Sequence, residues 1–501
     1  MEFSGLAFKM AAAESGGNVP HPRDLSLLLL TAWQATAIFG QPSVTRLNPT
    51  VKQIVEGVSE VQIGSTMKTL EGFGTRYVLS EQDNSTHGIG AAQRWIFNEF
   101  NSYSPRLRVS LHSFTARKSQ RLANDVALAN VVAVLPGTVE PDRYVVISSH
   151  YDSIASRRGP GTPRTEDEGP RTPQEIEPVA PGVSDNASGV AAVLELARVM
   201  SQYEFDKSVV FIAFSAEEVG LLGSQAYAAK AKQEKMEIEA VLNNDIIGND
   251  VAGNGRSANG RVRVFSEGPE DSPSRALARY TKEIAERYLP SMTVDLILRR
   301  DRFGRGGDHT SFNREGFAAV RLTTPSENYA NQHTATDTFA NASVPYATRV
   351  AKMNGAVLAS LALAPKPPVV MRPRAAGSTG STSPDNAAQM PARRPMGPGL
   401  TRGRSGYDAA LRWEMPNPEP DLAGYAVVIR ATTSPLWERE IYVGNVTEYN
   451  IPDLSIDDVV IGVKAIDKDG NQSLVSAYDL PALNVPARPD GGTPRAQTGG
   501  Q

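Results

Sequence analysis

The chain has 501 residues, 40% of them hydrophobic and 21% charged, which is an ordinary composition for a globular protein. This length exceeds what a single core usually supports, so we expect two domains and a processed or flexible part. The formal net charge of −4 argues against nucleic acid as the main partner and gives no support for attraction to a membrane surface. There is no cysteine. Disulfides, thiolate nucleophiles and thiolate zinc sites are therefore excluded, and any metal ion must be held by His, Asp and Glu.

The first residues have the character of an export signal. Residues 25–39 are mostly apolar, follow Arg23 and end near the small residues Ala35 and Ala37. A stretch of about 15 residues suits a signal-peptide core better than a transmembrane helix. We therefore interpret residues 1–40 as a signal peptide or leader, and we expect an exported protein, periplasmic or extracellular, without a transmembrane anchor after processing. A buried or amphipathic N-terminal helix is the alternative.

Residues 50–365 alternate between strand-like and helical segments. Helical apolar spacing begins at Val51 and again at Ile89. The order that follows is three strands, a helix, a strand, a helix, three strands and a helix. These segments cover residues 106–116, 130–135, 143–149, 189–203, 208–215, 220–232, 238–244, 262–266, 317–323 and 345–364. Such alternation predicts an α/β fold with a mixed, mostly parallel sheet flanked by helices.

Three stretches lack this periodicity. Residues 154–181 are rich in Pro, Gly, Arg and Glu, and a loop of this length inside a compact domain is usually functional or disordered. The composition of residues 366–404 predicts a flexible linker, and residues 488–501 are expected to form a disordered tail. Between them, residues 405–487 contain short alternating strands separated by turn residues. This pattern predicts a small β-sandwich, for which the sequence indicates no partner.

Side chains that can bind metal ions gather at five places, most of them at the ends of predicted strands. They are His150 with Asp152, Asp185, Glu217 with Glu218, Asp245, and His333. Taken singly, each has an ordinary explanation, such as a helix N-cap for Asp185. The carboxyl ends of parallel strands, however, meet at one edge of a sheet, where ligands and metal ions bind. The joint arrangement therefore predicts a site for two metal ions.

These residue types suit metal-assisted hydrolysis. Two divalent ions about 3.5–4 Å apart need a bridging carboxylate, terminal ligands, and open positions for water and substrate. Imidazole and carboxylate ligands suit zinc, with cobalt or manganese as possible substitutes. The ions lower the pKa of bound water towards about 7. A carboxylate beside a ligand can then carry a proton from the water to a leaving amine. The pair Glu217-Glu218 suits this division, because adjacent side chains point apart.

With these motifs the chain resembles the zinc exopeptidases of the bacterial leucyl aminopeptidase and aminopeptidase Y type, family twenty-eight of the metallopeptidases. The resemblance covers residues 50–365. It rests on the ordered motifs His-Tyr-Asp-Ser, Ser-Asp-Asn-Ala-Ser-Gly, Ala-Glu-Glu-x-Gly-Leu-x-Gly-Ser, Asn-x-Asp and His-Thr-x-Thr-Asp-Thr. It implies a zinc-peptidase-like fold and a secreted aminopeptidase that uses two zinc ions to remove N-terminal residues from peptide substrates.

The resemblance also implies a role for each site residue. Asp185 would bridge the two ions, and Glu217 would be the general acid and base. The terminal ligands would be His150 and Asp245 for one ion, and Glu218 and His333 for the other. Asp152 would orient His150 through the second nitrogen of its ring.

Two further segments carry a resemblance. Residues 307–312 resemble the family's Ser-Asp-His-x-x-Phe element, with Gly307 where Ser is common. There, Asp308 and His309 would line the pocket or hydrogen-bond to a ligand residue. Residues 405–487 resemble a fibronectin type III domain, with Trp413 as the core Trp of the second strand, although Val459 stands where the domain usually has Tyr.

Three other functions remain open. One is a glutaminyl cyclase, which shares the fold and several of these residues but acts with one zinc ion as an acyl transferase. Another is a carboxypeptidase or dipeptidase of the same clan, in which Arg299, Arg300, Arg302 and Arg305 could grip a substrate carboxylate. The third is a binding protein that acts through the β-sandwich. The sequence has no Gly-x-Ser-x-Gly elbow and no phosphate-binding glycine loop, so serine hydrolases and nucleotide-binding enzymes have little support.

Overall fold

The computed structural model describes residues 47–155, 179–301, 305–371, 399–403, 405–415 and 419–478. The expected leader (1–40) and tail (488–501) lie outside these residues, as do most of the loop 154–181 and most of the linker 366–404. The bounds expected for these segments and for the domains stay predictions. Within the described ranges, no helix combines the length and the apolar character that crossing a bilayer requires.

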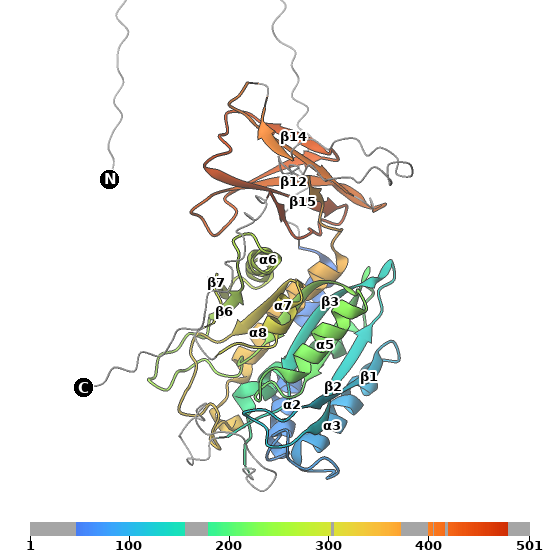
Figure 1. Ribbon diagram of the computed structural model, residues 1–501, viewed down its shortest axis with the longest axis vertical. Helices are drawn as coiled ribbons and strands as arrows, with labels where there is room; N and C mark the ends of the chain where they lie inside the picture. Colours follow the sequence, from blue (N-terminus) through green and yellow to red (C-terminus); the bar gives the residue numbers. More distant parts are fainter. Residues whose placement is uncertain are drawn as a thin grey trace, which may run out of the picture. The chain divides into compact units, whose positions relative to one another are not determined.

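Eight strands form one sheet in the larger part of the described chain (Figure 1). They are β1 (Arg108–Ala116), β2 (Val126–Leu135), β3 (Glu140–His150), β4 (Lys207–Phe214), β5 (Glu237–Asn244), β6 (Arg261–Ser266), β7 (Thr293–Ile297) and β8 (Ala319–Thr323). Their order is β1-β2-β4-β3-β5-β8-β6-β7. The four central strands run parallel to one another, whereas β1 and β2 at one edge and β6 beside β8 pair antiparallel. The expected mixed, mostly parallel sheet is confirmed.

Helices cover both faces of this sheet. They are α1 (Pro49–Gly57), α2 (Glu60–Gly72), α3 (Gly88–Tyr103), α4 (Ser188–Met200), α5 (Leu222–Gln233), α6 (Pro273–Tyr288), α7 (His309–Arg314) and α8 (Val344–Leu363). A π-helical turn (Val183–Ala187) precedes α4, and a short 3-10 turn (Phe339–Asn341) precedes α8. The sequence predicted two helices before β1, where the structure has three, and it did not predict α6, α7 or β7. It placed every other strand of the sheet to within about four residues at each end.

The central strands are apolar on both sides because each face packs on helices. In β3, Val145 and Ile147 belong to the larger core, which also contains residues of α4 and α8, while Val146 belongs to a smaller core with α5 and α7. This alternation follows from the two-residue period of a strand. A strand buried on both faces reads as a continuous apolar run, which explains why these strands were recognisable in the sequence.

The C-terminal part forms a β-sandwich of two antiparallel four-stranded sheets that share one hydrophobic core. One sheet contains β9 (Val369–Val370), β10 (Leu400–Arg402), β11 (Ala409–Glu414) and β14 (Glu448–Ile451); the other contains β12 (Leu422–Ala431), β13 (Arg439–Gly444), β15 (Val459–Asp467) and β16 (Ser476–Ala477). Trp413 lies in this core and packs edge-to-face on Tyr425, with ring centroids 5.5 Å apart. The likeness to a fibronectin type III domain stays a prediction.

Candidate metal centre

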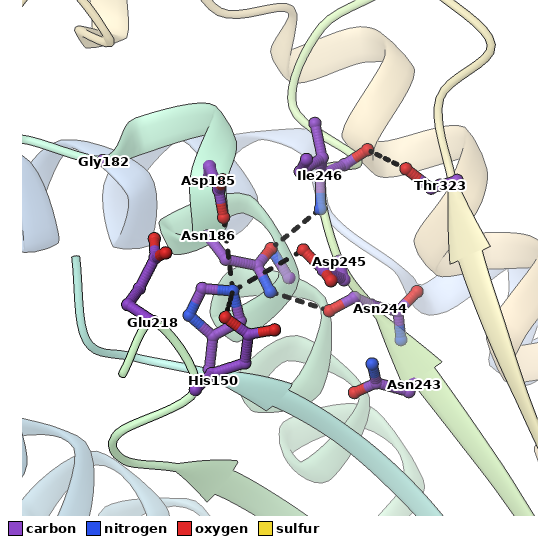
Figure 2. Close-up of polar contacts among 12 residues, drawn as sticks. His150, Gly182, Asp185, Asn186, Glu218, Asn243, Asn244, Asp245, Ile246 and Thr323 are labelled. Carbon is purple, nitrogen blue, oxygen red and sulfur yellow. Dashed lines mark hydrogen bonds and ion pairs between the residues drawn. The ribbon is translucent and has the colours of Figure 1, made fainter. Parts of the chain in front are cut away.

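Three of the five predicted clusters lie at the carboxyl ends of central parallel strands. His150 is the last residue of β3, Asp245 directly follows β5, and the pair Glu217-Glu218 comes shortly after β4 ends at Phe214. Asp185 reaches the same place from the π-helical turn before α4. Figure 2 shows the side chains of His150, Asp185, Glu218 and Asp245 pointing towards one another.

Asp185 lies between the two histidines. Its Oδ1 is 3.2 Å from Nε2 of His150, and its Oδ2 is 3.0 Å from Nε2 of His333. Asp245 approaches the first histidine, with 3.5 Å between its Oδ1 and Nε2 of His150. Glu218 approaches the second, with 3.1 Å between its Oε2 and Nε2 of His333. The structure therefore brings all five expected metal ligands together, as two groups that share Asp185.

The donor atoms fit divalent cations. Donor atoms of His150, Asp185 and Glu218 lie within 4.8 Å of one another, and so do those of His150, Glu217 and Asp245. Nε2 of His150 and Oε1 of Glu218 are buried and have no hydrogen-bond partner among the described residues. Buried polar atoms without a partner are costly, and a cation would satisfy both of these. Imidazole and carboxylate donors without thiolates are a set that zinc accepts.

Glu217 lies beside the two groups. Its Oε2 is 4.0 Å from Nε2 of His150, farther than the other carboxylates that contact this ring, and its side chain is 14% exposed towards a cavity. Burial raises the pKa of Glu217 well above its ordinary value, and the charges of Asp245 and Glu218 raise it further, although His150 opposes them. This carboxyl group can therefore hold a proton at a higher pH than an exposed one.

Asp185 and the two histidines favour each other's charged forms. Burial would raise the pKa of Asp185, but the neighbouring imidazoles of His150 and His333 keep it well below the ordinary value. Burial would likewise lower the pKa of His333, but Glu218 and Asp185 raise it well above the ordinary value. The site thus concentrates negative charge that two imidazoles offset only in part.

Asp152 contacts both His150 and the segment that carries Glu217. Its two carboxylate oxygens accept hydrogen bonds from the backbone N–H groups of Glu217 and Glu218, both at 3.1 Å. Nδ1 of His150 is 3.1 Å from the backbone oxygen of Asp152 and 3.7 Å from its carboxylate Oδ1. The expected contact with the second ring nitrogen is thus made mainly by the backbone, and the carboxylate fixes the position of Glu217 and Glu218.

Asp308 and His309 lie behind the centre rather than on the cavity wall. Both are buried, and neither carboxylate oxygen of Asp308 nor Nδ1 of His309 has a hydrogen-bond partner among the described residues. Burial raises the pKa of Asp308 to about 7 and lowers that of His309 to about 3, so His309 is neutral across the physiological range. Neither residue belongs to the two groups of potential metal ligands found among the described residues.

Arg321, which the sequence analysis missed, supports Asp245. It is buried in β8 with its Nε 3.1 Å from Oδ2 of Asp245. Burial would raise the pKa of Asp245, but Arg321 and His150 lower it. A Cβ added at Gly307 would lie 3.2 Å from Cδ of Arg321, so the Gly that replaces the usual Ser leaves room for this side chain. The sequence did contain a signal for Arg321, which is the one charged residue in the apolar strand Ala-Val-Arg-Leu-Thr. A fully buried charge needs a partner of opposite charge.

Two other missed residues hold the loop that carries Asp185. The carboxylate of Asp337 accepts hydrogen bonds from the backbone N–H groups of Ser184 (2.9 Å) and Asp185 (3.0 Å). Arg76 is fully buried and donates to the backbone oxygens of four residues on three segments. These are Leu70 (3.0 Å), Tyr151 (2.7 Å), Pro181 (2.5 Å) and Gly182 (2.9 Å). Asp337 belongs to the motif around His333, but no local signal marks Arg76.

Asn186 joins the start of α4 to the end of β5 (Figure 2). Its Nδ2 donates to the backbone oxygen of Asn244 at 2.8 Å, and its Oδ1 accepts from the N–H groups of Gly189 and Ile246. A Cβ added at Gly189 would lie 2.8 Å from the oxygen of Asn244 and 2.8 Å from Cβ of Ser149. Only glycine therefore allows the helix to approach these strands so closely.

Comparison with known proteins assigns the chain to a family. Residues 130–358, which contain all the expected ligands, match the family model described as peptidase family M28. A probable zinc metalloprotease of Leptosphaeria maculans is 33% identical over 86% of this chain and 97% of its own length. The chain belongs to peptidase family M28. It is accordingly a metallopeptidase, a hydrolase of peptide bonds, as the motifs predicted.

Other M28 relatives and solved structures are similar to this chain. A probable zinc metalloprotease of Pyrenophora tritici-repentis is 32% identical over 84% of this chain and 96% of its own length. An aminopeptidase structure from Legionella pneumophila is 19% identical, with a TM-score of 0.47 over 64% of this chain and 76% of its own. A glutaminyl cyclase structure from Fimbriiglobus ruber is also 19% identical, with a TM-score of 0.45 over 60% and 95%. These two structural likenesses do not discriminate between the two reactions.

Proposed function

We propose that this M28 peptidase is an aminopeptidase that uses two zinc ions to remove N-terminal residues from peptides. The position of Asp185 carries the proposal: its two oxygens lie 3.2 Å and 3.0 Å from Nε2 of two different histidines. A carboxylate placed in this way suits a pair of cations that share one ligand. The names of the fungal relatives support zinc. The ordered motifs, which resemble those of aminopeptidases, support cleavage from the N-terminus.

Zinc ions bound at this centre would supply an acidified water molecule and a Lewis acid for the scissile carbonyl. His150 and Asp245 would hold one ion and Glu218 and His333 the other, with Asp185 shared between the two groups of ligands. Glu217 takes the proton of the water and delivers it to the leaving amine. Burial raises its pKa, which suits a group that has to accept a proton. The bonds from Asp152 to the backbone of Glu217 and Glu218 fix the base relative to a ligand.

We also propose that the protein is exported. The support is the apolar stretch of residues 25–39 after Arg23, which lies outside the described residues. A signal-peptide core has this length and this kind of flank. N-terminal sequencing of the protein recovered from the medium or periplasm of its source tests this, and a product that stays in the cytoplasm with residues 1–40 attached would contradict it.

One experiment tests the enzymatic proposal. Metal-free protein is reloaded with zinc, and the zinc content per chain is measured by elemental mass spectrometry. The reloaded protein is given one peptide with a free and one with an acetylated N-terminus, and the released residues are identified in order. We expect two zinc ions per chain, stepwise release from the free N-terminus and no release from the acetylated peptide.

Other outcomes point to the other candidates. Release of residues from the C-terminus, with or without the acetyl group, would make the protein a carboxypeptidase. One zinc ion per chain, together with ammonia from a peptide that begins with glutamine, would make it a glutaminyl cyclase. Full zinc content without cleavage of any peptide would leave the proposed activity without support.

A further inference from the structure

The cavity beside the metal centre has a wall rich in arginine. Its volume is about 790 Å³. Six of the residues that line it are arginines, namely Arg121, Arg299, Arg300, Arg305, Arg314 and Arg321. Outside the metal centre, the only acidic residues in the described part of the lining are Glu267 and Asp301. Large apolar side chains are nearly missing from it, with Leu221 and Ile246 as the exceptions.

Two of these arginines are fixed inside the wall. Arg321 is 1% exposed and pairs with Asp301 at 2.9 Å as well as with Asp245. Arg305 has a side chain that is 13% exposed, and it pairs with Glu327 at 2.5 Å. The charges of these two guanidinium groups are therefore largely neutralised, and their ion pairs fix this part of the wall.

The arginines nearer the solvent are less neutralised. Arg300 is 82% exposed and pairs with Glu267 at 3.1 Å. Arg299 and Arg314 are exposed and form no ion pair with any residue in the described ranges. Arg121 donates to the backbone oxygen of Glu218 at 3.1 Å, which places its guanidinium group directly beside a metal ligand.

Charge counting shows that the cavity stays positive when metal is bound. The four carboxylates of the centre, those of Asp185, Glu217, Glu218 and Asp245, would be offset by two divalent ions. On the rest of the described wall, Arg300, Arg305 and Arg321 pair with acidic residues, whereas Arg299 and Arg314 form no ion pair within the described residues and leave an excess of positive charge. A cleft lined by one sign of charge concentrates ligands of the opposite sign. Guanidinium groups in addition bind carboxylates through two parallel hydrogen bonds.

We propose that the site selects peptides that carry a carboxylate close to the scissile bond, rather than peptides with a bulky apolar residue there. This inference rests on the proposed peptidase function. The carboxylate has two possible sources, an Asp or Glu side chain next to the cleaved bond or the free C-terminus of a very short peptide. Both present the same group to the arginine wall.

Matched substrates separate the two sources. One pair differs only by Glu or Gln in the first residue, and a second pair differs by Glu or Gln in the second residue, all with amidated C-termini. A third pair is a dipeptide with a free or an amidated C-terminus. We expect kcat/KM to be about 10- to 100-fold higher for the carboxylate member of at least one pair, which is the effect of a hydrogen bond to a charged group. The preference should shrink as salt is added.

Substitution of the wall tests its involvement. The double variant Arg299→Gln/Arg314→Gln should bring the carboxylate-to-amide ratio of kcat/KM towards one, mostly through KM. Arg402→Gln is the matched control, because Arg402 is an exposed arginine of the β-sandwich, where its side chain is 64% exposed. The control should leave the ratio unchanged.

The outcomes distinguish this inference from the proposed function. Cleavage of all substrates with equal or better turnover of the amide members overturns the carboxylate selectivity and leaves the peptidase proposal standing. A carboxylate preference that survives in the double variant overturns the assignment to Arg299 and Arg314. Failure to cleave any member, neutral or acidic, removes the proposed function itself.

Discussion

Glu217 and Glu218 are adjacent in sequence, yet their side chains serve different parts of the centre. Oε2 of Glu218 contacts Nε2 of His333 at 3.1 Å, whereas Glu217 faces the cavity 4.0 Å from His150. If Glu217 moves protons and Glu218 holds an ion, the two amide substitutions must have different effects. The difference separates catalysis from metal binding.

We predict that Glu217→Gln lowers kcat by about 100- to 10,000-fold, which is the contribution of a positioned acid or base, while the zinc content stays unchanged. Glu218→Gln should reduce the zinc content as well as the activity. Elemental analysis and peptide-cleavage rates on both variants provide the measurement. An active Glu217→Gln enzyme would refute the role given to this residue.

His112 of β1 is held neutral by its neighbours. Asn130 accepts a hydrogen bond from the N–H of Ser215 through its Oδ1 and donates through its Nδ2 to the oxygen of Gly223. These bonds fix the amide so that its Nδ2 also faces Nδ1 of His112 at 3.0 Å. That ring nitrogen must therefore be an unprotonated acceptor. Burial lowers the pKa of His112 below 6.5, and the charge of Lys230 lowers it further.

A lowered pKa in the folded state means that the contribution of His112 to stability is fully present above about pH 6.5 and is lost as the pH falls through the folded-state value. We predict that the free energy of unfolding of the wild type falls relative to that of His112→Gln when the pH is lowered from about 7 to about 5. Gln keeps an acceptor for Asn130 but cannot be protonated. Urea unfolding at both pH values measures this, and an identical difference at the two values would contradict it.

At the level of single residues, the candidate metal ligands were easier to predict from the sequence than the residues that hold them in place. His150, Asp245 and the Glu pair were recognisable because each directly follows an apolar strand. Arg76 acts through backbone oxygens on segments up to 106 positions away, which leaves no local pattern. The backbone conformation was equally hidden: Ala216, Ile246 and His333 have φ values of +64°, +62° and +57°, a region that side chains other than glycine rarely adopt.

Among the elements, the end of α2, the end of β3 and the segment before α4 meet at one side chain. Arg76 donates to Leu70, Tyr151, Pro181 and Gly182, which lie on these segments. Burial lowers the pKa of Arg76 to about 10, so it stays charged at neutral pH. Its planar fork reaches several acceptors at once, which an ammonium group cannot do.

We predict that Arg76→Lys lowers the free energy of unfolding of the metal-free protein by about 2–4 kcal/mol, because buried carbonyl groups lose their donors. Arg94→Lys is the matched control. Arg94 also donates to two backbone oxygens, those of Gln82 and Asn84, but on an exposed surface where water replaces the lost bonds. The control should change stability by about 0.5 kcal/mol or less. If urea unfolding gave the same loss of stability for both variants, the buried hydrogen bonds of Arg76 would stabilise the protein no more than the exposed ones of Arg94.

Two of the elements that the sequence did not predict, α6 and β7, have weak apolar patterns. Helix α6 contains the charged residues Arg275, Arg279, Lys282, Glu283 and Glu286, so few of its positions are apolar. Several of these charged side chains form ion pairs with neighbouring residues. Strand β7 has five residues and lies at the edge of the sheet, where partial exposure weakens the apolar signal. The strands buried on both faces were, by contrast, recognised.

In the central part of the sheet, the carboxyl ends of the strands carry the candidate catalytic centre, and the amino ends carry a buried ion pair that stabilises the fold. The candidate metal ligands His150 and Asp245 lie at the carboxyl ends of β3 and β5, whereas Lys207 lies buried at the start of β4. Nζ of Lys207 is 2.8 Å from Oε2 of Glu239 on β5 and donates to the backbone oxygen of Leu361 in α8 at 2.9 Å. Burial lowers the pKa of Lys207, but Glu239 counteracts this.

We predict that Lys207→Met lowers the free energy of unfolding by about 3 kcal/mol without changing the zinc content. This is the lower end of the range for breaking a buried ion pair, because Arg143 remains beside Glu239. Lys230→Met is the matched control: Lys230 pairs with Glu234 at 2.9 Å, but both side chains are about half exposed. Its effect should be between about 0 and 1 kcal/mol. A loss of zinc in Lys207→Met would show that the ion pair at the amino ends of the strands also affects metal binding at their carboxyl ends.

The turn that carries His333 also carries Asp337, whose carboxylate holds the N–H groups of Ser184 and Asp185. If the centre binds two ions as proposed, displacement of this turn would remove His333 from one ion and loosen Asp185, the ligand proposed for both. Binding of the first ion would then order the ligands of the second. The coupling between the two ions is reciprocal, because it is a binding free energy. We expect cooperative zinc uptake, in which native mass spectrometry of a partly titrated sample finds chains with no ion or two ions and few with one.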